Sequence, residues 1–266
     1  MQKLDRLGWT AGIALTSQGV RIGVRANRAD AIERVTRQLP AGWTFAKSPI
    51  VDVMYSISAH DNLPGSRVQR FNLLYAGIQR LARTTDFNEL MKAFEDDLHV
   101  TVAATTPRRI FFKAGVVAWK GRAILVAGPE SCGKTTLVNA LVEAGAIYYS
   151  DEYAVMDRKG LLHPYPVRMS VERSAHLQPE ARVKLGTRPL NIGTILLSQY
   201  KPRAVFKPVE ASPGEAVLTL LGICFTPMKN PEATLSLLAS VASTATVLKG
   251  NRGEAGDAAR KILSGL

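Results

Sequence analysis

The sequence predicts an α/β protein, with a mixed-sheet core over residues 106–266 and a small α+β module over residues 1–105. Three observations support this prediction. An apolar run at residues 124–126 leads directly into GPESCGKT at residues 128–135, and apolar residues then recur at helical spacing. Several short apolar runs typical of strands surround this segment. The preceding part of the chain alternates between strand and helix patterns and contains no comparable motif.

In the N-terminal module, period-two apolar patterns predict strands and longer periodic runs predict helices. The expected strands are a hairpin over residues 8–25 and single strands at 50–58 and 70–75, and the expected helices are at 28–39 and 87–104. Asp86 is placed to cap the later helix, and residues 61–66 contain a Pro-Gly turn. His60 and His99 are read as surface or core residues, because no Cys/His cluster has metal-ligand spacing.

The core is expected to begin near Pro107, which ends the preceding helical pattern. Its expected strands are at residues 110–112, 116–119, 124–126, 146–149, 153–156 and 192–197, and its expected helices at 137–142, 213–224, 232–248 and 253–263. Ser212 is placed to cap the helix that follows it. Residues 163–188 are rich in Pro, Arg and Lys, and we read them as a loop over the site.

Residues 128–135 match the phosphate-loop pattern G-x-x-x-x-G-K-[ST] at every position and lie between a strand and a helix, as the mechanism requires. The glycines let successive backbone N–H groups point at phosphate oxygens, and the helix N-terminus adds positive charge. Lys134 would reach the β- and γ-phosphates of ATP, and the Thr135 hydroxyl would hold Mg²⁺. The residues expected to bind the cofactor are Gly128, Pro129, Glu130, Ser131, Cys132, Gly133, Lys134, Thr135 and Thr136. The alternative is a glycine-rich turn without a ligand.

Two adjacent acids, Asp151 and Glu152, follow the strand expected at residues 146–149. Phosphoryl transfer needs a carboxylate for the metal, and transfer to a hydroxyl is helped by a carboxylate that accepts the hydroxyl proton. Neighbouring side chains at a strand end point to opposite sides, so the two acids could divide these tasks. The alternative is a polar strand end without a catalytic role.

With these motifs in order, residues 113–155 resemble the kinase domain of HPr serine kinase/phosphorylase, whose fold is related to that of phosphoenolpyruvate carboxykinase. That family has a His-Gly-Val strand, a phosphate loop, a helix ending in Gly, and a paired Asp-Asp. A similar order runs here through KAGV at residues 113–116, the loop at 128–135, Gly145, and the acids at 151–152. Residues 111–153 are also similar to kinase-like accessory proteins of ribosomal peptides such as lasso peptides. The resemblance implies a P-loop kinase core with a mixed sheet of this type.

The resemblance further implies a serine kinase that uses ATP and Mg²⁺, with roles carried by the matching positions. Asp151 matches the first family Asp and would be the general base, while Glu152 matches the second and would bind the metal together with Thr135. Lys134 would keep its phosphate role. Lys113 stands in place of the family's active-site His, where it could hold a phosphate but could shuttle protons only with a lowered pKa.

Other positions depart from the family pattern. Glu130 and Ser131 replace its Ser and Gly, and Thr136 stands where the family carries an acid. No segment clearly copies the HPr-recognition signature, so the acceptor is left as a hydroxyl of a peptide, a protein or a small molecule. An arginine that neutralises transition-state charge is expected after the acids, and Arg168 and Arg188 are the candidates.

The composition is typical of a cytoplasmic protein that folds around a hydrophobic core. The chain has 266 residues, of which 46% are hydrophobic, and no apolar run reaches the ~18 residues of a membrane span. The N-terminal segment lacks the apolar centre of a signal peptide, and two cysteines do not make a disulfide framework. The net charge of +12 is scattered along the chain rather than gathered in a basic tail. We therefore expect no membrane partner. The sequence does not fix the oligomeric state, and a homo-oligomer is one possibility.

The sequence leaves three functions to weigh. The leading interpretation is the ATP-dependent kinase. A nucleotide-binding regulator is the second, with Lys113 and Glu152 as marks of lost catalysis. A nucleic-acid-associated ATPase is the third, favoured by the net charge of +12 but not by the scattered basic residues.

Overall fold

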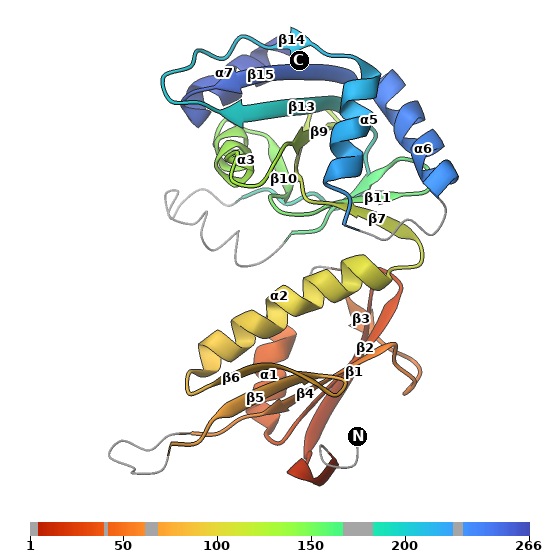
Figure 1. The fold of residues 1–266 in the computed structure, drawn as a ribbon, viewed down its shortest axis with the longest axis vertical. Coiled ribbons are helices and arrows are strands. Elements are labelled where there is room, and N and C mark those ends of the chain that lie inside the picture. The colour runs from red at the N-terminus through yellow and green to blue at the C-terminus, as the bar shows by residue number, and fades with distance from the viewer. Residues whose placement is uncertain (1–4, 40–41, 62–68, 167–182, 226–230) are drawn as a thin grey trace. The chain divides into compact units, whose positions relative to one another are not determined.

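The computed structural model describes residues 5–39, 42–61, 69–166, 183–225 and 231–266 (Figure 1). The chain divides into two compact units, Met1–Pro107 and Arg108–Leu266. The described residues form a mixed α/β structure with six α-helices and three sheets.

The first unit contains one sheet in the order β3-β1-β2-β4-β5-β6, in which β2 and β4 pair in parallel and the other neighbours are antiparallel. Its elements are a 3-10 turn (Asp5–Leu7), β1 (Ala11–Ser17), β2 (Val20–Ala26), α1 (Ala29–Arg37), β3 (Thr44–Phe45), β4 (Val53–Ser58), β5 (Asn72–Ala76), β6 (Gln79–Thr84) and α2 (Phe87–Thr105). The predicted hairpin, both helices and the strands at β4 and β5 are confirmed. The sequence pattern does not predict β3 or β6, and most of the turn expected at residues 61–66 lies outside the described residues.

Helix α2 begins where the sequence predicts, because the Asp86 side chain accepts a hydrogen bond from the backbone N–H of Asn88 at 2.8 Å. One face of the helix is fully buried and consists of Leu90, Phe94, Leu98 and Val102. The Phe94 ring lies edge-on to the Tyr55 ring of β4, with 5.1 Å between the ring centroids. The helix therefore packs its apolar face on the sheet.

The second unit contains a six-stranded mixed sheet in the order β10-β8-β9-β13-β15-β14 and an antiparallel sheet in the order β12-β11-β7. The strands are β7 (Arg109–Phe112), β8 (Gly115–Trp119), β9 (Arg122–Ala127), β10 (Ile147–Ser150), β11 (Ala154–Asp157), β12 (Leu162–His163), β13 (Ile192–Tyr200), β14 (Val209–Glu210) and β15 (Thr246–Arg252). The helices are α3 (Lys134–Glu143), α5 (Pro213–Gly222), α6 (Pro231–Thr244) and α7 (Ala255–Gly265). Helices α3 and α7 cover one face of the larger sheet, and α5 and α6 cover the other (Figure 1).

Alternate residues of β9 fill the two faces of this sheet. Ile124 and Val126 pack with residues of α3 and α7, whereas Leu125 and Ala127 pack with residues of α5 and α6. Strands β9, β13 and β15 run parallel, so their carboxyl ends meet at one edge of the sheet. Residues 128–133 leave β9 at this edge, which is where ligands bind in open α/β sheets.

The helix predicted over residues 232–248 is wrong in its last part. Helix α6 ends at Thr244, and the residues from Thr246 form β15, which pairs along its whole length with β13. The short apolar run here fits a helix and a strand equally, and pairing with a distant strand decides between them. The predicted cap of α5 is confirmed, because Ser212 and Glu215 form a reciprocal capping box.

Candidate functional site

The loop between β9 and α3 has the backbone of an anion-binding turn. Ser131 and Gly133 adopt left-handed conformations, with φ of +60° and +82°. Such turns direct successive backbone N–H groups into one concavity. Glycine is required at this last position for two reasons. The φ of Gly133 is positive, and a Cβ there would lie 2.4 Å from Nη2 of Arg252. The loop lies between β9 and α3, which begins at Lys134, as the motif predicts.

Two cations bind the backbone oxygens of this loop. Lys134 Nζ donates to the oxygens of Gly128 and Pro129 at 3.1 and 2.7 Å. Arg252 Nη2 donates to the oxygens of Gly133 and Cys132 at 2.6 and 3.4 Å. These four hydrogen bonds hold the backbone of the loop in place.

Sequence reasoning missed Arg252. It is the last residue of β15, its side chain is 2% exposed, and it also donates from Nη1 to the backbone oxygen of Gly253 at 3.2 Å. Burial lowers the pKa of Arg252, and its Nε has no hydrogen-bond partner among the described residues. A signal was present in TVLKGNRG at residues 246–253, since a β-branched run before Gly and Asn is typical of a strand end.

A cavity of about 410 Å³ opens beside this loop. It is lined by Lys113, Glu130, Ser131, Lys134, Thr135, Asp151 and Glu152. All of these residues were singled out from the sequence, and the fold brings together segments that lie far apart in the chain. Thr136, the last residue expected to bind the cofactor, is exposed and does not line this cavity.

Both acids line the same cavity. They lie in a bend beyond β10, outside the strand whose alternation the prediction assumed. Asp151 is buried, and its Oδ1 accepts a hydrogen bond from the Tyr148 hydroxyl at 2.6 Å. Burial and the neighbouring carboxylate raise the pKa of Tyr148, so its proton stays on the phenol and fixes the orientation of Asp151.

Lys113 and Glu152 form an ion pair, with 2.8 Å between Nζ and Oε1. Lys113 Nζ also lies 4.6 Å from the centroid of the Tyr153 ring. Burial by itself lowers the pKa of Lys113, but the hydrogen bond and charge of Glu152 outweigh it and the pKa is raised. Lys113 is therefore charged at neutral pH, which suits holding a phosphate and does not suit shuttling a proton.

Of the two arginine candidates, only Arg188 is described. Arg168 lies outside the described residues, as does most of the loop expected at residues 163–188. Arg188 is exposed and does not line the cavity, and its backbone oxygen accepts from the Tyr149 hydroxyl at 2.9 Å. Among the described residues, no group of three or more His, Cys, Asp or Glu side chains could hold a metal ion by itself.

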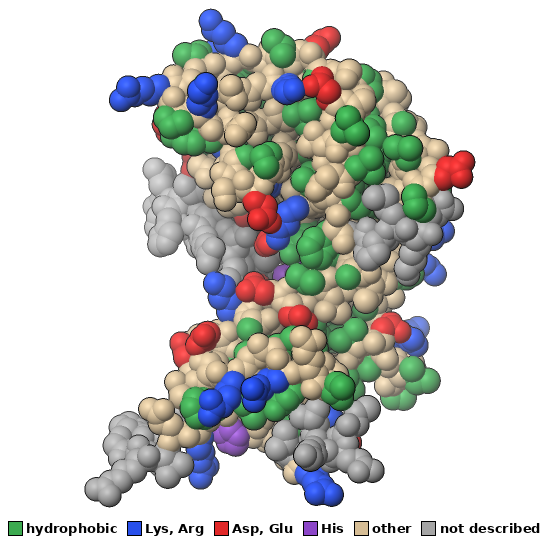
Figure 2. Space-filling model, viewed as in Figure 1, with side chains coloured by type: hydrophobic (Ala, Val, Ile, Leu, Met, Phe, Trp, Pro, Cys, Tyr) green, Lys and Arg blue, Asp and Glu red, His purple; other side chains and the backbone are tan. Residues whose placement is uncertain are grey.

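Comparisons with known proteins give no match: neither models of protein families nor curated proteins match this chain. Within the part of the chain that is described, no helix is both long and apolar enough to cross a bilayer. On the face shown in Figure 2, Lys and Arg side chains are spread over each unit and interleaved with Asp and Glu. The function is therefore argued from the cavity and its residues.

Proposed function

We propose that this protein is an ATP-dependent kinase that transfers the γ-phosphate to a serine-type hydroxyl of a peptide, a protein or a small molecule. The observation that carries this proposal is the cavity that Lys134 and Thr135 of the phosphate loop share with Asp151 and Glu152. A cation and a hydroxyl suited to Mg-ATP lie beside a carboxylate suited to accept a proton, as phosphoryl transfer requires. A core of the HPr kinase/phosphoenolpyruvate carboxykinase type and a cytoplasmic location belong to the same proposal.

In this proposal, the loop at residues 128–133 and the N-terminus of α3 bind the β- and γ-phosphate oxygens through backbone N–H groups. Lys134 Nζ, which donates to the oxygens of Gly128 and Pro129, would turn from them to the same phosphates. Thr135 and Glu152 would hold Mg²⁺, since they line one cavity and offer the hydroxyl and carboxylate oxygens that this ion prefers. When bound, Mg²⁺ supplies neutralisation of phosphate charge.

Asp151 accepts the proton of the acceptor hydroxyl while the hydroxyl oxygen attacks the γ-phosphorus. The new O–P bond forms as the bond to the leaving oxygen of ADP breaks, and the proton ends on the Asp151 carboxylate. Tyr148 keeps this carboxylate oriented through its 2.6 Å hydrogen bond. Lys113 adds a positive charge to the cavity in which the phosphoryl group is transferred.

A nucleotide-binding regulator is the second candidate, and one observation favours it. The carboxylate of Glu152 is already engaged by Lys113 at 2.8 Å, and a regulator could keep this pair intact while it binds nucleotide. In a kinase, by contrast, Glu152 must also reach the metal. The two candidates differ in whether phosphate leaves ATP.

Incubation with γ-labelled ATP and a panel of serine-containing peptides, proteins and small hydroxyl compounds tests the proposal. We expect label transfer by the wild type to at least one acceptor class, and loss of transfer in Asp151→Asn with ATP binding retained. A wild type that binds ATP but labels no acceptor supports the regulator. Equal transfer by wild type and Asp151→Asn contradicts the assignment of the base.

A further inference from the structure

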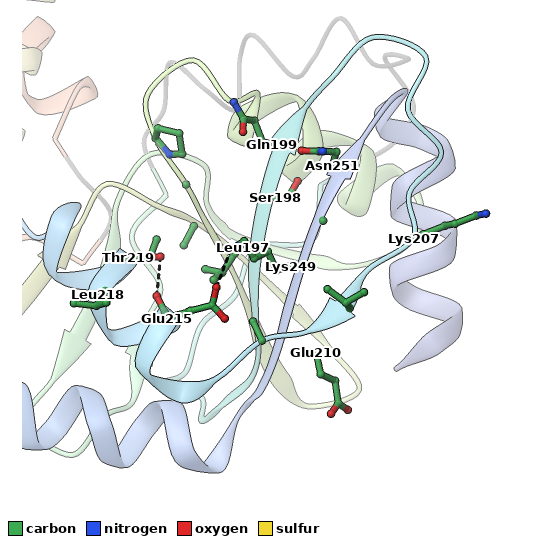
Figure 3. Close-up of a pocket in the computed structure, with 16 residues that line it drawn as sticks. Leu197, Ser198, Gln199, Lys207, Glu210, Glu215, Leu218, Thr219, Lys249 and Asn251 are labelled. Atoms are coloured by element: carbon green, nitrogen blue, oxygen red, sulfur yellow. Dashed lines mark hydrogen bonds and ion pairs between the residues drawn. The ribbon is translucent and has the colours of Figure 1, made fainter.

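A second cavity, of about 800 Å³, adjoins the start of the phosphate loop at residues 127–129 (Figure 3). Its lining includes the carboxyl ends of three parallel strands, at residues 127–129, 197–199 and 249–251, together with residues of β14 and α5. Gly128 and Pro129, whose backbone oxygens bind Lys134, form part of its wall. A ligand whose phosphates lie in the loop can therefore extend into this cavity.

One end of the cavity is polar. Gln199 and Asn251 lie together at that end, at paired positions of the adjacent strands β13 and β15 (Figure 3). Alternate residues of β13 face opposite sides of the sheet: Leu197 packs on the side of α5 and α6, and Leu196 on the side of α3 and α7. Gln199 therefore shares the face of Leu197 and the cavity, whereas the Ser198 hydroxyl faces the other side. The two amides offer both donors and acceptors, which suit the edge of a heterocyclic base.

The rest of the cavity is bordered by apolar side chains and one ion pair. Leu218 of α5 and Val209 of β14 line it and are 70% and 63% exposed. Glu215 and Lys249 pair within the lining at 2.7 Å. Apolar walls with a few placed polar groups are typical of sites for small organic ligands.

We propose that this cavity holds the nucleoside, the base and ribose, of the triphosphate whose phosphates bind the loop. The inference rests on the proposed function. Because the acceptor hydroxyl must reach Asp151, which lines the first cavity, the acceptor enters the first cavity. The second cavity is then left for the nucleoside. The nucleoside then extends from the start of the loop, at Gly128 and Pro129, over the strand ends where open α/β sheets bind their ligands.

The test compares Mg-ATP with inorganic tripolyphosphate, which carries the phosphates without a nucleoside. Both affinities are measured by calorimetry for the wild type and for the double variant Gln199→Ala/Asn251→Ala, which removes two exposed side chains. We expect the double variant to lose about tenfold in ATP affinity, since two hydrogen bonds are removed, while its tripolyphosphate affinity stays within about twofold. Asn191→Ala, which removes an exposed side chain just before the start of β13, is the matched control and should change neither affinity.

Lys134→Ala separates failure of this inference from failure of the proposed function. It should weaken both ligands, because both use the loop. If it does so while the double variant keeps the wild-type ratio of the two affinities, the nucleoside site is wrong and triphosphate binding stands. A double variant that binds ATP normally but has a raised KM for the acceptor also overturns the inference, since the cavity then holds the acceptor. If Lys134→Ala weakens neither ligand, the proposed function fails and the nucleoside site fails with it.

Discussion

Replacing Arg252 with methionine tests the part of the site that the structure adds to the sequence. Methionine fills much of the same volume but donates no hydrogen bond. The backbone oxygens of Gly133, Cys132 and Gly253 then lose donors that lie at 2.6, 3.4 and 3.2 Å. The change therefore removes the anchor behind the phosphate loop without touching the cavity that the loop lines.

The expected loss of stability follows from the shortest of these hydrogen bonds. A buried backbone oxygen left without its partner costs about 1–3 kcal/mol, and the burial of the guanidinium, which lowers the pKa of Arg252, offsets part of this. We expect a net loss of about 2 kcal/mol in the free energy of unfolding. For a unit of this size, that loss corresponds to a fall in Tm of about 4–8 °C. The affinity for Mg-ATP should fall as well, because the loop is no longer held in shape.

Thermal melts with and without Mg-ATP measure both effects. Arg252→Lys keeps the charge but not the planar fork, so it should recover stability only in part. Arg260→Met is the matched control, because Arg260 is exposed and pairs only with Asp257 among the ion pairs of the described residues. An Arg252→Met protein with the Tm and the ATP response of Arg260→Met would refute the anchoring role.

Three further results are expected. Asp151→Asn should bind Mg-ATP as the wild type does but transfer phosphate about 10²–10⁴-fold more slowly in the labelled-ATP assay, because it lacks the base. Glu152→Gln should raise the Mg²⁺ concentration for half-maximal transfer, measured by Mg²⁺ titration, while Cys132→Ser should change neither rate nor affinity. Asp157 is a test of pH dependence: burial alone raises its pKa, but hydrogen bonds from His163 and two backbone N–H groups lower it overall. Its stabilisation is therefore present above the unfolded pKa of about 4 and lost as pH falls through the folded pKa, so the Tm difference between wild type and Asp157→Asn should shrink toward pH 3.

The local parts of the site could be predicted from the sequence. The phosphate loop is where the motif places it, because a buried strand, glycines at left-handed positions and an adjacent helix are all encoded within residues 123–143. Caps such as Asp86 and Ser212 are equally local, since each bonds to a backbone N–H two or three residues ahead. Short sequence patterns of this kind determine the local backbone conformation by themselves.

The non-local parts could not be predicted. Lys113 and Glu152 are 39 residues apart in the sequence, and their pairing depends on the turn beyond β10. Arg252 lies 119 residues from Gly133, and only the parallel pairing of β15 with β13 brings it behind the loop. The second cavity likewise combines three strand ends and α5, and no single stretch of sequence signals it.

The central claim is that the phosphate loop binds ATP, and titration of the wild type and Lys134→Ala with Mg-ATP tests it most directly. Lys92→Ala, which removes an exposed lysine of α2, is the control for loss of one positive charge. A charged hydrogen bond contributes about 1.5–3 kcal/mol, so Lys134→Ala should bind about 10- to 100-fold more weakly than the wild type and Lys92→Ala should not differ from it. A wild type that does not bind Mg-ATP, or a Lys134→Ala variant that binds it with wild-type affinity, would contradict the account.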